Sequence, residues 1–229
     1  MKTVVSTKTL SPILRNQLEV SGLRVLDYDF ISIAFINFKY TYNNAISIFT
    51  STNAVKSVLL NDEINQIKKN KCCCVGDNTK AFLEENGFEV LFYAQYAADL
   101  IKDLKPIVNA NDFMFFSGNL RRNTIPIFFK ENNKSFVEIQ TYRTALTPIE
   151  IKENIDAVLF FSPSAVESFF SKNKIKNQPL FCIGNTTAEK ASEIANMKSK
   201  IQNAEIEKKL EISEIVKKLE KERDQLVND

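Results

Sequence analysis

An internal repeat constrains the fold of this chain more than any other feature of its sequence. The segment 45–60, AISIFTSTNAVKSVLL, aligns without gaps on the segment 156–171, DAVLFFSPSAVESFFS. Further along, a second alignment in a slightly shifted register places CVGDNT at 74–79 on CIGNTT at 182–187. These matches indicate a tandem duplication of a unit that spans about half of the chain.

The repeated segment predicts a strand, a polar turn and a helix. Residues 157–161 are a continuous apolar run, which is typical of a strand buried on both faces of a parallel sheet. The SPS at 162–164 ends this strand and supplies hydroxyls where a helix would be capped, with proline suited to the first turn. The apolar residues within 165–170 then recur at helical spacing. Such a corner can bind anions, because unpaired backbone N–H groups point out of it.

Strands and helices are expected to alternate along the whole chain, which predicts an α/β protein with parallel sheets and ligands at the carboxyl ends of the strands. Strands are expected at 2–6 and 112–117, and their VVS at 4–6 and FFS at 115–117 match in the register of the first alignment. The further expected strands and extended segments are 23–27, 30–38, 45–50, 71–75, 88–92 and 135–142. The expected helices are 11–20, 52–60, 77–86 (capped by Asp77-Asn78-Thr79), 98–104, 125–130 and 186–195. A weak strand at 200–202 and an amphipathic helix within 205–226 complete the pattern; we expect the helix to dock, and a coiled-coil partner site is the alternative.

The residue inventory excludes several classes of chemistry. The chain has no histidine, which removes Ser–His and Cys–His nucleophiles and the usual general base. Cys72, Cys73 and Cys74 are consecutive strand residues and Cys182 is the repeat equivalent of Cys74, so buried thiols are expected and a metal site is not. The five glycines are too scattered for a dinucleotide-binding motif or a P-loop. We expect no cofactor.

Charge and hydropathy predict a soluble cytoplasmic protein. The net charge of +2 gives no strong field for nucleic acid. No apolar run approaches the length of a transmembrane helix, and the first ten residues lack the apolar core of a signal peptide. We therefore expect neither a nucleic acid nor a membrane as a partner.

An ordered series of motifs resembles the uroporphyrinogen-III synthase family. The series covers most of the chain and consists of FTSTNAV at 49–55, CVGDNTKAFLEENGFEV at 74–90, TYRT at 141–144, FFSPSAVESF at 160–169 and CIGNTTAEKA at 182–191. The resemblance implies two small flavodoxin-like α/β domains with parallel sheets, joined by two chain crossings at 31–38 and 140–147. One domain would combine 1–34 with 147–229, and 35–146 would form the other. Each half of the repeat would then contribute to both domains.

The resemblance also implies a reaction. The substrate would be hydroxymethylbilane, a linear tetrapyrrole with eight carboxylates, which the family closes into a ring with inversion of the last pyrrole and loss of water. The pyrroles supply the electrons, so the reaction needs no metal or redox cofactor, and much of the catalysis can come from orientation. We expect a cytoplasmic monomer, and the resemblance implies a role in tetrapyrrole and heme biosynthesis.

The resemblance assigns one candidate catalytic residue. Tyr142 matches the tyrosine that the family places on a linker, where a protonated phenol could assist departure of the hydroxyl group. The alternative is a strand tyrosine that only packs its ring. Arg121 and Arg122 could reach substrate carboxylates, although a solvated helix face is the plainer interpretation.

The candidate substrate-binding residues lie at turns where helix N-termini are expected, after positions 6, 51, 76, 117, 162 and 184. Where the family often begins with a T-R-P-like motif, this chain has Thr7-Lys8-Thr9, so Lys8 would replace an arginine. For Thr186 and Thr187, helix capping alone is the competing interpretation, and the serines carry the same ambiguity. The full set is Thr7, Lys8, Ser51, Thr52, Gly76, Ser117, Ser162, Ser164, Gly184, Thr186 and Thr187.

A different class of function remains open from the sequence. A catalytically silent two-domain relative would keep the fold and bind an acidic ligand or a protein partner in the cleft between its domains. Retention of Tyr142, Thr186 and Thr187 favours the enzyme.

Overall fold

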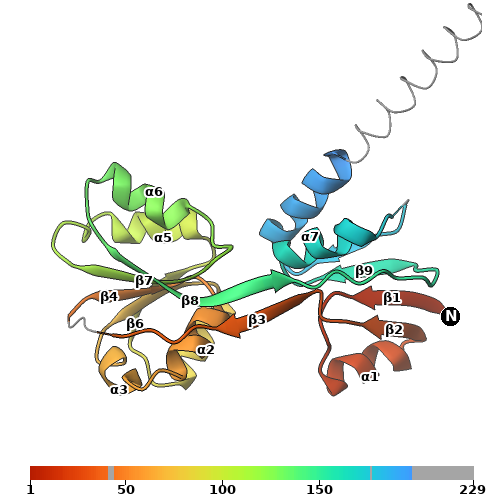
Figure 1. Cartoon of the computed structure of the whole chain (residues 1–229), viewed down its shortest axis with the longest axis horizontal. Coiled ribbons are helices and arrows are strands. Elements are labelled where there is room, and N and C mark those ends of the chain that lie inside the picture. The colour runs from red at the N-terminus through yellow and green to blue at the C-terminus, as the bar shows by residue number, and fades with distance from the viewer. Residues whose placement is uncertain (41–43, 176, 198–229) are drawn as a thin grey trace, which may run out of the picture. The chain divides into compact units, whose positions relative to one another are not determined.

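The chain divides into two compact units, each built on its own sheet. The computed structural model describes residues 1–40, 44–175 and 177–197 (Figure 1). Unit 1 combines Met1–Ile31 with the described part of the chain from Leu146 onward, and unit 2 consists of Ser32–Ala145. The expected weak strand at 200–202 and the expected helix within 205–226 lie outside the described residues.

Unit 1 is a parallel sheet with helices. Its elements are β1 (Lys2–Ser6), α1 (Pro12–Val20), β2 (Leu23–Asp27), β9 (Ala157–Phe160), α7 (Pro163–Lys172), β10 (Leu180–Cys182) and a helix that covers 185–197. The strand order is β10-β9-β1-β2 and every neighbouring pair is parallel. Numbered along the unit, this is the order 2-1-3-4 that flavodoxin-like sheets share. The phenylalanines of β9 and α7 pack with Val5 and Phe30 in one core.

Unit 2 is a larger doubly wound sheet. Its elements are β3 (Ile31–Phe35), β4 (Ile46–Phe49), α2 (Thr52–Leu59), α3 (Ile64–Ile67), β5 (Cys72–Val75), α4 (Asp77–Glu85), β6 (Val90–Ala94), α5 (Ala97–Leu104), β7 (Phe113–Gly118), α6 (Thr124–Glu131) and β8 (Val137–Leu146). The order is β3-β8-β7-β4-β5-β6, and β8 to β6 are parallel throughout. Numbered along the unit without β3, this is the doubly wound order 3-2-1-4-5. β3 runs opposite to β8, since Ile36 N–H donates to the carbonyl of Thr141 while Thr147 N–H donates to that of Phe30.

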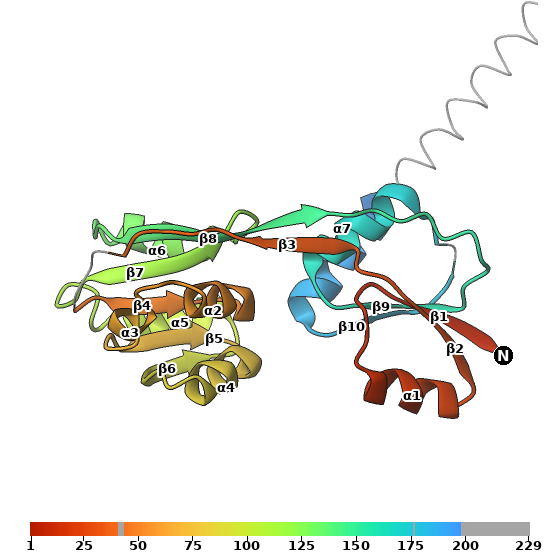
Figure 2. The same ribbon diagram turned by 60° about the horizontal axis from the view of Figure 1, so that its bottom comes forward.

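Helices cover both faces of the unit 2 sheet (Figure 1 and Figure 2). Helices α2, α3 and α4 pack over one core, in which the rings of Phe49 and Phe116 stack with centroids 5.0 Å apart. Helices α5 and α6 pack over a second core that includes Phe115 and Phe129. Successive side chains of a strand point to opposite faces of the sheet and therefore enter different cores, as a strand buried on both sides requires.

The repeat has a direct structural counterpart. The first alignment relates β1 to β7, α1 to α6, β4 to β9 and α2 to α7, and the second alignment relates β5 to β10. The order β2-β1-β9-β10 in unit 1 therefore corresponds to β8-β7-β4-β5 in unit 2. Each sheet takes strands from both halves of the repeat. The predicted α/β fold class with two parallel-dominated sheets and an internal repeat is confirmed.

Local sequence signals explain most helix starts. Ser11, Ser51 and Ser162 each cap a helix, because their hydroxyls accept a hydrogen bond from a first-turn N–H. The predicted cap Asp77-Asn78-Thr79 is wrong: Gly76 occupies the cap position with φ +88°, and Asp77 is already helical. The short helix α3 is absent from the sequence-based prediction, because four residues are too few to show a helical period.

Candidate functional site

The predicted site residues form one group in each unit, at the carboxyl ends of parallel strands. In unit 1 these are Thr7 and Lys8 after β1, Ser162 and Ser164 after β9, and Gly184, Thr186 and Thr187 after β10. In unit 2 they are Ser51 and Thr52 after β4, Gly76 after β5, Ser117 at the end of β7 and Tyr142 in β8. The two groups flank the points where the strand order reverses, between β1 and β9 and between β4 and β7. Open α/β sheets bind their ligands at such points.

In unit 1, Thr7 has a structural role in the sheet. Its side chain is 1% exposed, and both its N–H and its hydroxyl donate to the carbonyl of Leu159, at 3.0 and 2.9 Å. The hydroxyl is therefore committed to joining β1 and β9. Lys8, which follows it, is exposed. No helix starts directly after Ser6, because α1 begins only at Pro12.

The two other corners of unit 1 are helix N-termini. The hydroxyl of Ser162 accepts the N–H of Ala165 at 3.1 Å and lies 3.2 Å from the hydroxyl of Ser164. In the last corner the carbonyl of Gly184 accepts the N–H groups of Thr187 and Ala188, both at 3.0 Å. Thr186 and Thr187 therefore lie inside the first turn and are not N-caps. The interpretation of these threonines as plain caps is wrong.

In unit 2, Tyr142 lies on the face of β8 that packs under α2. Its ring joins Val137 and Ile139 in the core on that face. Strict alternation from these two residues would place Thr141 there instead, but the pairing of β7 with β8 shifts register between Ser117 and Gly118. The shift leaves Thr141 unpaired with β7 and places Tyr142 opposite Gly118. A β-bulge thus determines the face on which the phenol lies.

The phenol of Tyr142 hydrogen-bonds to Ser51 at the N-terminus of α2. Burial of the ring raises the pKa of Tyr142, because a phenolate would lose water, and the bond from Ser51 partly opposes this rise. The phenol therefore holds its proton at neutral pH. The structure brings together two candidates, Ser51 and Tyr142, that lie far apart in the sequence.

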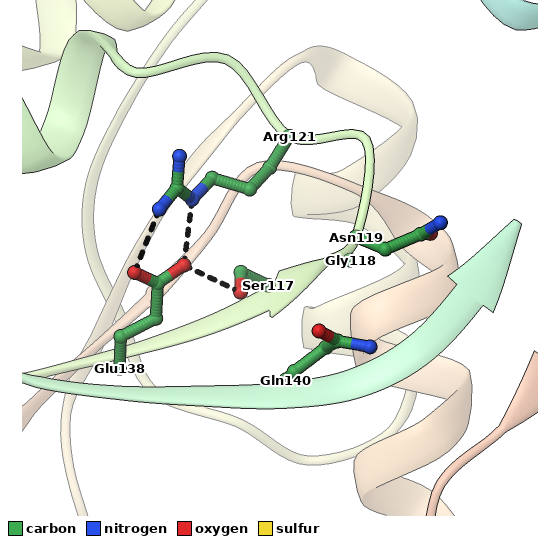
Figure 3. A pocket seen from close by; sticks show the side chains of 6 residues that line it. All are labelled: Ser117, Gly118, Asn119, Arg121, Glu138 and Gln140. Atoms are coloured by element: carbon green, nitrogen blue, oxygen red, sulfur yellow. Dashed lines mark hydrogen bonds and ion pairs between the residues drawn. The ribbon is translucent and has the colours of Figure 1, made fainter.

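A charged network that the sequence did not predict lies at the end of β7 (Figure 3). Glu138 accepts two hydrogen bonds from the guanidinium of Arg121, at 2.6 and 2.9 Å, and a third from the hydroxyl of Ser117 at 2.7 Å. The guanidinium of Arg121 holds the pKa of Glu138 below its usual value, and Ser117 adds to this effect. With Gly118, Asn119 and Gln140 these residues line a polar cavity of about 390 Å³.

This network corrects two expectations. Arg121 lies in the loop before α6 and not on a solvated helix face. Ser117 does not precede a helix directly either, since α6 begins at Thr124, and its hydroxyl donates to Glu138. No sequence spacing could have paired Arg121 with Glu138, because the contact depends on how β8 lies beside β7.

Three of the four cysteines are buried. Cys72, Cys73 and Cys74 are buried free thiols, as predicted, and burial raises the pKa of Cys72 and of Cys74 to about 12. Cys182, for which a buried thiol was also expected, is only partly buried, because β10 is an edge strand of its sheet. Among the described residues, no cluster of three or more Cys, Asp or Glu side chains could hold a metal ion. No helix within the described ranges is long and apolar enough to cross a membrane.

The chain therefore belongs to a class of α/β proteins with two units, in which each unit has its own parallel-dominated sheet and takes strands from both halves of an internal repeat. A family model described as uroporphyrinogen-III synthase HemD matches residues 9–207. The chain belongs to the uroporphyrinogen-III synthase family, as its motifs predicted.

Solved structures of this family share the fold. The crystal structure of uroporphyrinogen-III synthetase from Helicobacter pylori 26695 is 16% identical and has a TM-score of 0.63, covering 85% of this chain and 90% of its own. That of a mutant uroporphyrinogen III synthase from the extremely thermophilic bacterium Thermus thermophilus is 14% identical with a TM-score of 0.61, covering 84% of this chain and 89% of its own. No curated protein matches the chain.

Proposed function

We propose that this protein closes hydroxymethylbilane into uroporphyrinogen III, with inversion of the last pyrrole ring and loss of water. This assigns it to the carbon–oxygen lyases. Family membership places the chain in tetrapyrrole biosynthesis and does not favour the alternative of a catalytically silent relative. Within the chain, the observation that carries the proposal is a partly buried, protonated phenol at the end of a parallel sheet, hydrogen-bonded to a helix N-terminus.

Tyr142 would act as the acid. Its phenolic proton passes to the hydroxyl group of the substrate while the carbon–oxygen bond breaks and a pyrrole nitrogen supplies the electron pair. Ring closure onto a pyrrole carbon releases a proton, which restores the phenol, and the products balance as one macrocycle and one water. Histidine, the most common general acid, is absent from this chain, so the role falls to another group.

Helix N-termini would bind the carboxylates of the substrate. Helices α2, α4 and α7 and the helix at 185–197 begin at the strand ends, and their first N–H groups attract anions. Lys8 adds a positive charge in unit 1. In this proposal the hydroxyls of Thr7 and Ser117 do not donate to the substrate, because both hydroxyls, and the N–H of Thr7 as well, already donate within the protein.

The remaining properties follow from the same assignment. We infer a cytoplasmic monomer that uses no cofactor and binds neither nucleic acid nor membrane. We also infer that the two domains are the discontinuous 1–34 with 147–229 and the inserted 35–146.

The decisive experiment supplies hydroxymethylbilane to the purified protein without added metal or nucleotide. The products are oxidised, and the type I and type III porphyrin isomers are separated and quantified. We expect mainly the type III isomer, because spontaneous closure without ring inversion gives type I. Type I alone, formed at the rate of the protein-free control, would refute the proposal in favour of a binding protein.

A further inference from the structure

The absence of a side chain at Gly118 determines where the ring of Tyr142 lies. A Cβ atom at that position would lie 2.3 Å from Cζ and 2.8 Å from the phenolic oxygen of Tyr142. Real Cβ atoms do not approach other atoms so closely, so any larger residue at position 118 displaces the ring.

The glycine and the bulge act together. The register shift beside Gly118 turns the ring of Tyr142 onto the α2 face, and the bare backbone of Gly118 gives the ring its space there. The φ angle of Gly118 is not in the left-handed region. The position therefore requires glycine for the space of the tyrosine ring and not for backbone conformation.

We propose that Gly118 is a positioning residue for Tyr142: its bare backbone forms the seat of the ring, the space in which the phenol is held in alignment with the substrate. This inference rests on the proposed function, because it specifies how the proposed acid is held.

Gly118→Ala tests the seat of the ring. We expect a fall in kcat of about tenfold or more with KM changed by less than about threefold, because a displaced acid loses its alignment with the reacting group. In a Tyr142→Phe background the same substitution should change kcat by less than about twofold, since the acid is already absent. Equal losses in the two backgrounds would overturn the role of Gly118.

Two outcomes are kept separate by the readouts. If the parent protein makes no type III isomer, the proposed function fails, yet the thermal midpoints of Gly118→Ala alone and in a Tyr142→Leu background still test the seat of the ring. If Gly118→Ala does not fold, the ring seat is tested by Gly118→Ala in the Tyr142→Leu background, where a smaller side chain should restore the thermal midpoint. Failure of that rescue counts against the seat.

Discussion

At the scale of single residues, the side chain of Tyr142 has two separate roles. Its hydroxyl is the proposed acid, and its ring provides the packing. The ring contributes to the core under α2, while the hydroxyl bonds to Ser51. The two parts of the side chain can therefore be separated by one substitution.

Tyr142→Phe should lower turnover by about 100-fold or more, the scale of a positioned general acid. The thermal midpoint should change little, because the lost hydrogen bond contributes about 1 kcal/mol. Steady-state rates of type III formation and a thermal melt measure both effects. A rate within about twofold of the parent would mean that the phenol is structural and that orientation alone drives the reaction.

The carboxylate of Glu138 gives unit 2 a pH-dependent contribution to stability. Its pKa is lowered in the folded state, chiefly by Arg121, so the folded state favours the ionised form. The contribution is complete above the unfolded pKa of about 4.3 and is lost as the pH falls through the lower folded pKa.

Denaturant unfolding of the parent should therefore show stability that falls as the pH drops below about 4.3. Glu138→Gln should be less stable than the parent at pH 7, and the difference should shrink at pH 3. Guanidinium titrations at the two pH values measure it. A difference of the same size at both pH values would contradict the ionic role of Glu138.

At the scale of elements, the repeat supplies a matched pair of buried serines in equivalent helices. Ser57 in α2 is 3% exposed and donates its hydroxyl to the carbonyl of Thr141 at the bulge of β8. Its repeat equivalent, Ser168 in α7, is fully buried, and the hydroxyl of Ser168 has no hydrogen-bond partner in the described part of the chain. The hydroxyl of Ser57 is thus hydrogen-bonded in α2, whereas the equivalent hydroxyl of Ser168 in α7 is buried without a partner in the described part of the chain.

Ser57→Ala should lower the free energy of unfolding by about 1 kcal/mol, while Ser168→Ala should leave it unchanged or raise it. The gain in helix propensity from Ser to Ala is common to both, so the difference reports the hydrogen bond. Urea unfolding of the two variants is the measurement. Equal changes would mean that the hydroxyl of Ser168 is satisfied in solution.

At the scale of the whole molecule, the strand exchange makes the halves of the repeat dependent on each other. Residues 1–111 hold β1 and β2 of one sheet together with β3 to β6 of the other, so neither sheet is complete. Residues 32–145, in contrast, contain nearly the whole unit 2 sheet and both of its cores.

A fragment that spans 32–145 should therefore unfold cooperatively on its own, whereas fragments 1–111 and 112–229 should not. Mixing the latter two should restore a cooperative transition, because each supplies the missing strands of the other. Thermal melts followed by circular dichroism test all three. Cooperative unfolding of 1–111 alone would show that the halves are independent folding units.

The sequence by itself determined the local elements. The corners at Ser51 and Ser162 could be predicted because apolar runs, hydroxyl caps and first-turn prolines act within a few residues. The buried cysteines of β5 followed from the same pattern. The family resemblance, and not the repeat, predicted that each half contributes to both units.

The tertiary structure decided the face of Tyr142, the space at Gly118 and the Arg121–Glu138 pair. Each depends on the register of β8 against β7, which is set by hydrogen bonds between two strands that α6 separates in the chain. A shift of one position turns every later side chain to the other face, and a single sequence carries no signal for it when both faces are apolar. The chemistry of the candidate site was therefore visible in its residue types, but its geometry came from the pairing of two strands.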